Sequence, residues 1–281
     1  MNYQEALNKG IKILKSNKIK SFILDSEILL ASSLKLDRAR LLLNLNNNIK
    51  ENQKEIFFNF INRRKKNEPI AYILGFKEFW KNNFKINKSV LIPRPDTEIL
   101  VDQVLKEIKK NEIKHILDIG TGSGCIILSV LKERKNCFGY GIDISKKAIN
   151  LAKNNAKIQP ISNRIKFLHS NIDNYYFGKY DLIVSNPPYI IRKDIRNLDD
   201  DIKKFEPKLA LDGGNDGLDV IKKVIYKSKS ILRIIGMLAL EIGNEQFKKV
   251  SKILKSNKFK TRYLVKDYRE NIRCILSTLE N

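Results

Sequence analysis

The feature that most limits the fold of this chain is an alternation of helical and strand-like segments that begins at residue 97. Short apolar runs (HILDIG, YGIDI, RIKFLHS, YDLIVS, MLALEIG) are separated by stretches with apolar residues at three- and four-residue spacing. A strand, a helix and a second strand form a right-handed crossover between parallel strands. The pattern predicts an α/β fold with a mostly parallel sheet covered on both faces, ending in one more helix and a strand pair.

The first part of the chain has a different pattern. Residues 1–72 show helical spacing without strand alternation, which predicts a helical bundle. Asp25 and Asp37 precede helical runs, and we expect both to cap helices. The stretch PIAYILGFKEFW and the residues after it predict short extended segments, with a hairpin-like linker over 73–92. The remaining residues, 93–281, form the predicted α/β domain.

Composition limits the setting and the partners. The net charge of +23 comes from lysines scattered through the chain, so we expect a solvated basic surface and no dedicated nucleic-acid site. Three cysteines without metal spacing or an even pairing scheme predict no metal site and a reducing, cytoplasmic location. The first ten residues lack a signal pattern, and no apolar run has the length to span a membrane.

A glycine-rich stretch, LDIGTGSGC, links the first buried strand to a helix. Gly120, Gly122 and Gly124 can adopt positive φ and allow a ligand close to the backbone. Asp143, at the end of the next strand, can accept hydrogen bonds from both hydroxyls of a ribose. The simpler alternative is a glycine turn that eases packing, followed by a surface Asp. The predicted cofactor-binding residues here are Gly120, Thr121, Gly122, Ser123, Gly124 and Asp143.

The spacing of the glycines bears on which nucleoside binds. It is G-x-G-x-G, and Cys125 stands where a dinucleotide fingerprint has its last glycine. Asp118, just before the loop, would repel a pyrophosphate and suits a cationic amino-acid group. A ligand with an ammonium, a sulfonium and a ribose matches this charge pattern, which predicts S-adenosylmethionine. Asn171 ends the third strand, where its amide can meet an adenine edge.

The tetrapeptide Asn186–Tyr189 follows the fourth strand. Methylating a planar amide nitrogen requires its NH2 group to be held and aimed, because the lone pair is delocalised. We expect the Asn186 side-chain oxygen and the Pro187 carbonyl to accept its two N–H bonds. Pro187 and Pro188 stiffen the loop, and Tyr189 offers an aromatic face to the substrate. The alternative is a proline loop that merely ends a strand.

DIGTGSG followed by NPPY resembles the S-adenosylmethionine-dependent N-methyltransferases with a Rossmann-like domain. That group includes adenine-N6, RNA-guanine-N2 and protein-glutamine-N5 enzymes, so the tetrapeptide does not select the substrate. Three stretches (LIPRPDTE, FEPKLALDGGNDGLD and DYRENIRCI) resemble the peptide chain release factor glutamine methyltransferases over essentially the whole chain. A nucleic-acid adenine-N6 methyltransferase and a non-catalytic, basic nucleotide-binding module are the alternatives.

The resemblance to the release factor glutamine methyltransferases implies specific roles. Its fold is a Rossmann-like methyltransferase domain with an N-terminal helical bundle, which binds or orients the substrate. That substrate is the glutamine of the Gly-Gly-Gln tripeptide in class-1 peptide chain release factors. Residues 120–124 and Asp143 become cofactor contacts, and residues 186–189 become the glutamine clamp, with Asn186 also touching the cofactor. Arg94 and Glu98 line the site or pair with each other, and Ile172 replaces an aromatic residue common in the family.

Overall fold

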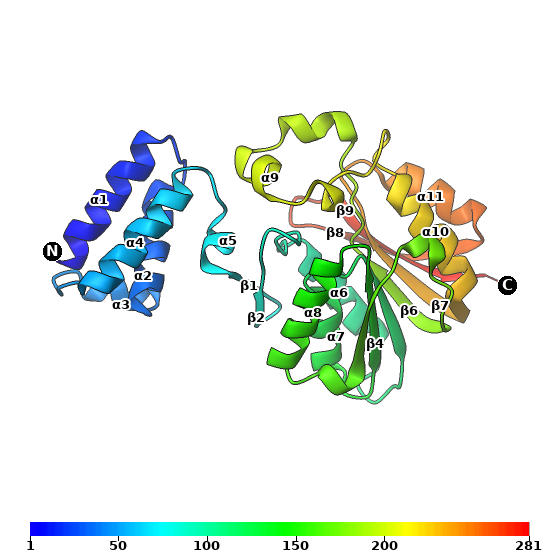
Figure 1. The fold of residues 1–281 in the computed structure, drawn as a ribbon. Coiled ribbons are helices and arrows are strands. Elements are labelled where there is room, and N and C mark those ends of the chain that lie inside the picture. The colour runs from blue at the N-terminus through cyan, green and yellow to red at the C-terminus, as the bar shows by residue number, and fades with distance from the viewer. Residues whose placement is uncertain (281) are drawn as a thin grey trace. The chain divides into compact units, whose positions relative to one another are not determined.

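The computed structural model describes residues 1–280, which form two compact units (Figure 1). The first unit consists of residues 1–76 together with 199–205. The second consists of residues 77–198 and the chain from 206 onward. The fold predicted from sequence, a helical region followed by a Rossmann-like α/β domain, is confirmed. No helix among the described residues is long and apolar enough to cross a membrane.

The first unit is built from helices around one apolar core. Leu14, Leu30, Phe57 and Ile61 are fully buried there, and they come from the first, second and fourth helices. The repeat of apolar residues every three or four positions explains why each helix buries one face. The helices of this unit are α1 (Tyr3–Ser16), α2 (Phe22–Leu34), α3 (Arg38–Leu43), α4 (Glu51–Arg64), α5 (Ile70–Leu74) and α9 (Asp200–Phe205).

Two local predictions in this region need correction. Asp37 caps α3 as expected, accepting a hydrogen bond from the Arg40 backbone at 2.8 Å. Asp25, however, lies inside α2, which begins earlier at Phe22. Its buried carboxylate accepts from Arg64 Nε on α4 at 2.7 Å, so a partner 39 residues away takes the side chain that sequence assigned to a cap. The extended segment predicted before the hairpin begins instead with the short helix α5.

A seven-stranded sheet forms the centre of the second unit, in the order β5-β4-β3-β6-β7-β9-β8. The first five strands of that order run parallel, and β9 is antiparallel to both its neighbours. The predicted hairpin is also present, as β1 (Phe76–Phe79) and β2 (Asn82–Lys85). The sheet strands are β3 (His115–Ile119), β4 (Phe138–Asp143), β5 (Ile165–His169), β6 (Tyr180–Ser185), β7 (Leu232–Glu241), β8 (Phe259–Lys266) and β9 (Ile272–Leu279).

Helices cover both faces of this sheet, as the unbroken apolar strands predicted (Figure 1). Successive strand residues enter opposite cores: Ile116 packs on one face and Leu117 on the other. One face is covered by α6 (Thr97–Glu107), α7 (Cys125–Glu133) and α8 (Lys146–Ile158). The other is covered by α10 (Asp219–Ile231) and α11 (Phe247–Ser256).

The order of the strands creates a crevice at one edge of the sheet. β3 lies between β4 and β6, so the chain leaves β3 toward one side and returns on the other. Loops that follow such neighbouring strands diverge and leave an opening at their carboxyl ends. Ile119 at the end of β3 is in register with Ser185 at the end of β6. The glycine loop and the proline tetrapeptide therefore begin side by side.

Gly10 provides a test of packing against helix propensity. Glycine inside a helix costs about 1 kcal/mol relative to alanine. A Cβ at Gly10, however, would stand 2.6 Å from the buried ring of Phe57. We predict that Gly10→Ala lowers the free energy of unfolding by about 1 kcal/mol or more, because overpacking outweighs propensity. Urea unfolding followed by circular dichroism measures this.

The matched control is Asn8→Ala at an exposed position of the same helix, where the gain in helix propensity is opposed only by loss of the exposed hydrogen bond from Gln4 Nε2 and no overpacking arises. Stabilisation by Gly10→Ala would contradict the packing argument.

Candidate functional site

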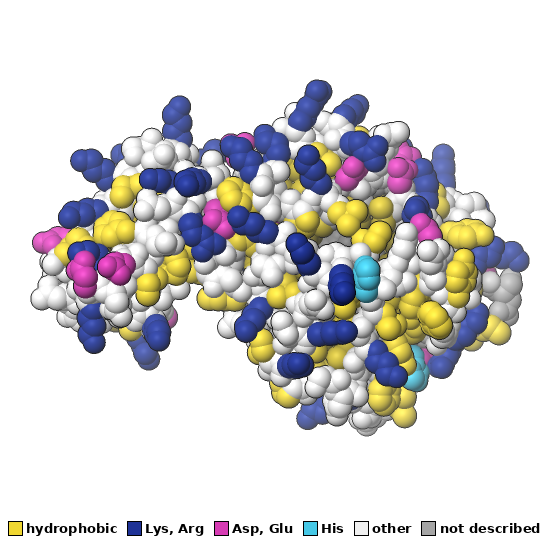
Figure 2. Space-filling model, viewed as in Figure 1, with side chains coloured by type: hydrophobic (Ala, Val, Ile, Leu, Met, Phe, Trp, Pro, Cys, Tyr) yellow, Lys and Arg dark blue, Asp and Glu magenta, His cyan; other side chains and the backbone are white. Residues whose placement is uncertain are grey.

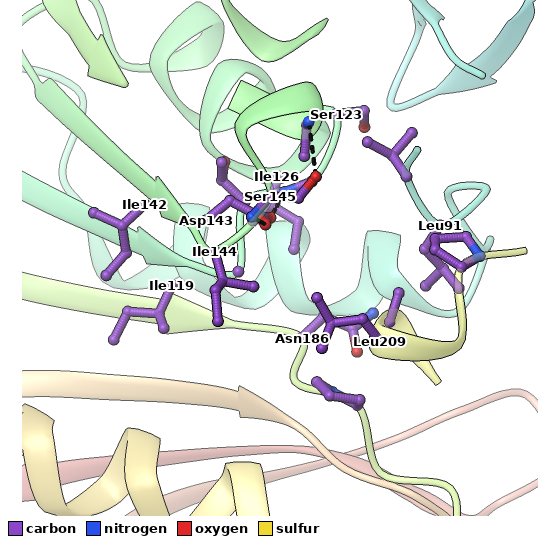
Figure 3. Close-up of a pocket in the computed structure, with 18 of the residues that line it drawn as sticks. Leu91, Ile119, Ser123, Ile126, Ile142, Asp143, Ile144, Ser145, Asn186 and Leu209 are labelled. Carbon is purple, nitrogen blue, oxygen red and sulfur yellow. Dashed lines mark hydrogen bonds between the residues drawn. The ribbon is translucent and has the colours of Figure 1, made fainter. Parts of the chain in front are cut away.

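A cavity of about 360 Å³ opens at the carboxyl ends of β3, β4 and β6, within the second unit (Figure 3). In Figure 3, Asp143 and Ser123 lie to one side of it, while Leu91, Asn186 and Leu209 lie to the other. The predicted site residues that line this cavity are Gly120, Thr121, Gly122, Ser123, Asp143, Asn171, Asn186 and Pro188. Residues separated by more than sixty positions in sequence thus share one concave surface.

The glycine loop forms the floor of the cavity beside β3. Gly120 and Gly122 have φ values of 73° and 56°, a region that L side chains rarely adopt. The backbone N–H groups of Gly120 and Thr121 both donate to the Ile142 carbonyl, at 2.9 and 3.0 Å. The loop is therefore tied to the end of β4, and its backbone lies open to a ligand.

Asp143 is held by the same loop. Its two carboxylate oxygens accept from the backbone N–H groups of Gly122 (2.9 Å) and Ser145 (2.8 Å). Burial raises the pKa of Asp143, and these two hydrogen bonds oppose the rise. Each oxygen keeps a further lone pair for an incoming hydroxyl. Both the carboxylate and the open glycine backbone therefore match what a ribose requires.

Asp118 lies beneath the loop and does not line the cavity. Its Oδ2 accepts from the Thr121 hydroxyl at 2.7 Å, and its Oδ1 has no partner among the described residues. Burial and the nearby Asp143 raise the pKa of Asp118 to about 7. The expectation that Asp118 faces a cationic group of the ligand is therefore corrected, because its carboxyl is turned toward Thr121.

Asn186 is oriented by a side chain from α6. Its Nδ2 donates to Thr97 Oγ1 at 3.1 Å. The preceding Ser185 is fully buried, and its hydroxyl donates to the Ile119 carbonyl at 2.7 Å, which joins the ends of β6 and β3. An amide has one donor end and one acceptor end. Since Thr97 engages the donor end, Oδ1 is the end left for a ligand in the cavity.

Two glycines let another loop support the tetrapeptide from behind. A Cβ at Gly213 would lie 2.9 Å from the Pro188 carbonyl oxygen, and one at Gly217 would lie 2.6 Å from the Tyr189 carbonyl oxygen. The Gly213 N–H donates to the Ile190 carbonyl at 2.8 Å. Gly213 and Gly217 are therefore required because backbone packs directly on backbone.

Arg94 joins two loops at the rim of the cavity. It donates to Glu206 Oε1 at 2.5 Å, and the Glu206 carboxylate also accepts from the Ile92 N–H at 3.2 Å. The alternative of an Arg94–Glu98 pair is therefore wrong. Glu98 instead accepts from the Trp80 N–H at 2.9 Å and does not line the cavity.

Three predicted site residues do not line the cavity: Gly124, Pro187 and Tyr189. Gly124 adopts φ 80° where α7 begins, and a Cβ there would meet Leu128 at 3.1 Å. Pro187 is buried. The Tyr189 side chain packs against the core on the α10–α11 face, and burial raises its pKa to about 12. Its ring is therefore directed to the core and not to the cavity.

Sequence reasoning missed several residues of the site. Thr97 and Leu209 line the cavity, and they belong to LIPRPDTE and FEPKLALDGGNDGLD, where no residue pattern marks either of them as a site residue. No local spacing connects them with Asn186, so only the fold reveals their place. Within the described part of the chain, no three His, Cys, Asp or Glu side chains are placed to hold a metal ion.

The chain matches two protein families. The family described as "PrmC N-terminal domain" matches residues 5–75, and the family described as "Methyltransferase small domain" matches residues 95–204. Two solved structures share the fold. A methyltransferase from Pyrococcus furiosus is 15% identical with a TM-score of 0.52, covering 69% of this chain and 87% of its own. The hMettl16 catalytic domain is 17% identical with a TM-score of 0.54, covering 70% and 76%.

Curated relatives are similar over nearly the whole chain. A protein of Clostridium acetobutylicum named "Release factor glutamine methyltransferase" is 40% identical over 280 residues, covering 99% of this chain and 98% of the relative. A protein of Fusobacterium nucleatum with the same name is 41% identical, covering 97% of this chain and 78% of the relative.

Asp118 gives a prediction about pH. Because burial raises its pKa from 3.8 to about 7, the carboxyl stabilises the fold below its unfolded-state pKa and loses that contribution as pH rises toward 7. Asp118→Asn removes this dependence. We take the free energy of unfolding of Asp118→Asn minus that of the wild type. This difference should be larger at about pH 8 than at about pH 5, by about 1 kcal/mol or more.

Thermal unfolding at the two pH values measures the difference. Asp102→Asn on α6, at a half-exposed position outside the cavity, serves as the control and should show no such change. A constant difference between Asp118→Asn and the wild type would contradict the raised pKa.

Proposed function

The chain belongs to the family of release factor glutamine methyltransferases, and we propose that it methylates the glutamine of the Gly-Gly-Gln motif in a class-1 peptide chain release factor. S-adenosylmethionine is the methyl donor that this family uses. The observation that carries the proposal is that one cavity is lined by both Asp143, at the end of β4, and Asn186, just after β6, with β3 between these two strands. A nucleoside site and an amide site then share one space.

The cofactor site that we propose uses the side chains around β4 and β5. Asp143 would accept from the ribose hydroxyls, and the apolar Ile144 and Ile172 would enclose the adenine. Asn171 already accepts from the Asp173 N–H at 3.0 Å, which leaves its NH2 group to meet the adenine edge. Bound S-adenosylmethionine supplies a methyl group made electrophilic by its sulfonium.

The acceptor side of the site is built around Asn186. Its Oδ1 and the Pro187 carbonyl would each accept one N–H of the substrate glutamine, which holds the amide nitrogen still and weakens its conjugation. Thr97 keeps the Asn186 amide in the required orientation. No charged base is needed, because the nitrogen becomes cationic on methylation and its proton can then leave.

The helical unit has a separate role in the proposal. We assign residues 1–72 to binding or orienting the release factor, residues 73–92 to the linker and the residues from 93 onward to catalysis. The compartment that we propose is the cytoplasm, where release factors act. The three free, buried cysteines are compatible with that reducing setting.

Nucleic acid is the alternative substrate, and a methyl-transfer assay distinguishes it from a release factor. On the face drawn in Figure 2, Lys and Arg side chains are spread over both units rather than collected in one stripe. Purified protein with methyl-labelled S-adenosylmethionine should label the Gly-Gly-Gln peptide of a cognate release factor. Label in RNA or DNA alone would favour an adenine methyltransferase, and cofactor binding without transfer would favour a non-catalytic module.

Asp143→Ala is expected to weaken cofactor binding before it affects anything else. Loss of two ribose hydrogen bonds to a charged group should raise the cofactor Kd at least about tenfold. Calorimetric titration with S-adenosylmethionine measures it. Asp102→Ala, at a half-exposed position of α6 that does not line the cavity, should leave the Kd unchanged. An unaltered Kd in Asp143→Ala would remove Asp143 from the cofactor site.

Asn186→Ala should separate chemistry from cofactor binding. Removing one aimed polar group typically lowers turnover by on the order of 10²-fold, and we expect that loss in kcat. The cofactor Kd should change far less, because Asn186 acts mainly on the substrate amide. The control is Asn154→Ala on the exposed face of α8. Equal losses in kcat and cofactor affinity would overturn the clamp role.

A further inference from the structure

A buried carboxyl stands next to Asn186 without an evident structural purpose. Glu241 ends β7 with 1% of its surface exposed. Ser185 of β6 is in register with Leu240 of β7, so the residues that follow them, Asn186 and Glu241, are neighbours at the edge of the sheet. The Oε2 atom of Glu241 has no hydrogen-bond partner among residues 1–280.

The charges around Glu241 do not neutralise it. Arg273 of β9 favours its ionised form, but Arg273 Nε lies 2.9 Å from Asp267 and 3.7 Å from Asp96, so two other carboxylates share that cation. The titratable or charged side chains that interact with Glu241 are Asp96, Cys125, Tyr189, Arg273 and Cys274. A buried carboxylate without its own counter-ion lowers stability, which points to a functional reason for its presence.

The Thr97 hydroxyl links Glu241 to Asn186 through the direction of its hydrogen bonds. The Thr97 hydroxyl has one proton, and it already accepts from Asn186 Nδ2 at 3.1 Å. Its own proton must therefore go to another acceptor. Thr97 and Asn186 both favour the ionised form of Glu241, which lies beside Asn186 at the ends of β6 and β7, so its carboxylate is the acceptor that we assign to the Thr97 proton. An ionised carboxylate can accept but cannot donate.

We propose that Glu241 is a positioning residue: by accepting the Thr97 proton, its carboxylate fixes the Asn186 amide with Nδ2 turned inward and Oδ1 turned to the methyl-accepting nitrogen. Without an acceptor at Glu241, Thr97 can donate to Asn186 instead, and the amide turns over. It then presents a donor to the substrate NH2 group, which needs acceptors. This inference rests on the proposed function for its catalytic consequence, but not for the orientation itself.

The orientation of the Asn186 amide should depend on pH. Burial raises the pKa of Glu241 to about 7. A protonated carboxyl can donate to Thr97, so the orientation of Asn186 is no longer enforced when the group is neutral. kcat should therefore fall as pH drops through about 7, and the pH profile should follow the titration of a single group.

Glu241→Met tests the proposal because it retains volume and removes the acceptor. We expect kcat to fall about tenfold or more, part of the loss expected for Asn186→Ala. The cofactor Kd should stay within about twofold, and Tm should hold or rise, because a buried unpaired carboxyl has gone. Glu241→Gln keeps one acceptor oxygen, so its kcat should fall less than that of Glu241→Met. Because an amide does not titrate in this range, kcat of Glu241→Gln should no longer fall as pH drops through about 7. The exposed Glu245→Gln is the matched control.

A second pair of variants covers the case in which Glu241→Met does not fold. Thr97→Val removes the hydroxyl, and its kcat should fall as much as that of Glu241→Met. Thr97→Ser retains a hydroxyl, and its kcat should stay close to that of the wild type. In an Asn186→Ala background, Glu241→Met should cause no further loss, because Glu241 acts through Asn186. Wild-type kcat in Glu241→Met, or losses that add in the double variant, would overturn the proposal.

The orientation can also be measured without any methyl transfer. With isotope-labelled asparagine, the Asn186 side-chain NH2 signals, assigned from their loss in Asn186→Ala, should shift with a midpoint near pH 7. The shift should vanish in Glu241→Gln. If the shift is seen but the wild type methylates no release factor, the proposed function fails and the positioning role stands. If the signals do not titrate in the wild type, the positioning role fails whatever the substrate is.

Discussion

The pairing of β3 with β6 is the constraint on which the rest of the site depends. Ile119 and Ser185 lie in register at the ends of these strands, and the Ser185 hydroxyl donates to the Ile119 carbonyl. This pairing brings the glycine loop after β3 and the Asn186–Tyr189 loop after β6 to the same end of the sheet. The chain order reverses at the same place, so the crevice opens there and not elsewhere.

Opposite backbone properties are combined around this crevice. Gly120 and Gly122 supply conformations that other residues rarely reach, whereas Pro187 and Pro188 restrict theirs. Gly213 then allows a third segment to pack on the proline loop from behind. The proline loop is thus supported by direct backbone packing, while the backbone of the glycine loop faces the cavity.

Two buried carboxyls show how the site reduces stability for function. Asp118 and Glu241 lie at the ends of β3 and β7, and burial raises the pKa of each to about 7. Each has one oxygen without a partner among the described residues. Asp118 accepts a hydrogen bond from Thr121 of the glycine loop, and Thr97 and Asn186 favour the ionised form of Glu241. For Glu241, the positioning role proposed above gives a reason for keeping such a group.

By itself, the sequence determined the alternation of helices and strands, the glycine loop, Asp143 and the tetrapeptide at Asn186, because such patterns depend on residues within one or two elements of each other. The tertiary structure alone decided the side-chain partners. It paired Asp25 with Arg64 across 39 positions, Arg94 with Glu206 across 112 and Asn186 with Thr97 across 89. It also turned Tyr189 into the core. Local propensity extends over a few residues, whereas these contacts are set by how sheet and helices pack, which no short stretch of sequence encodes.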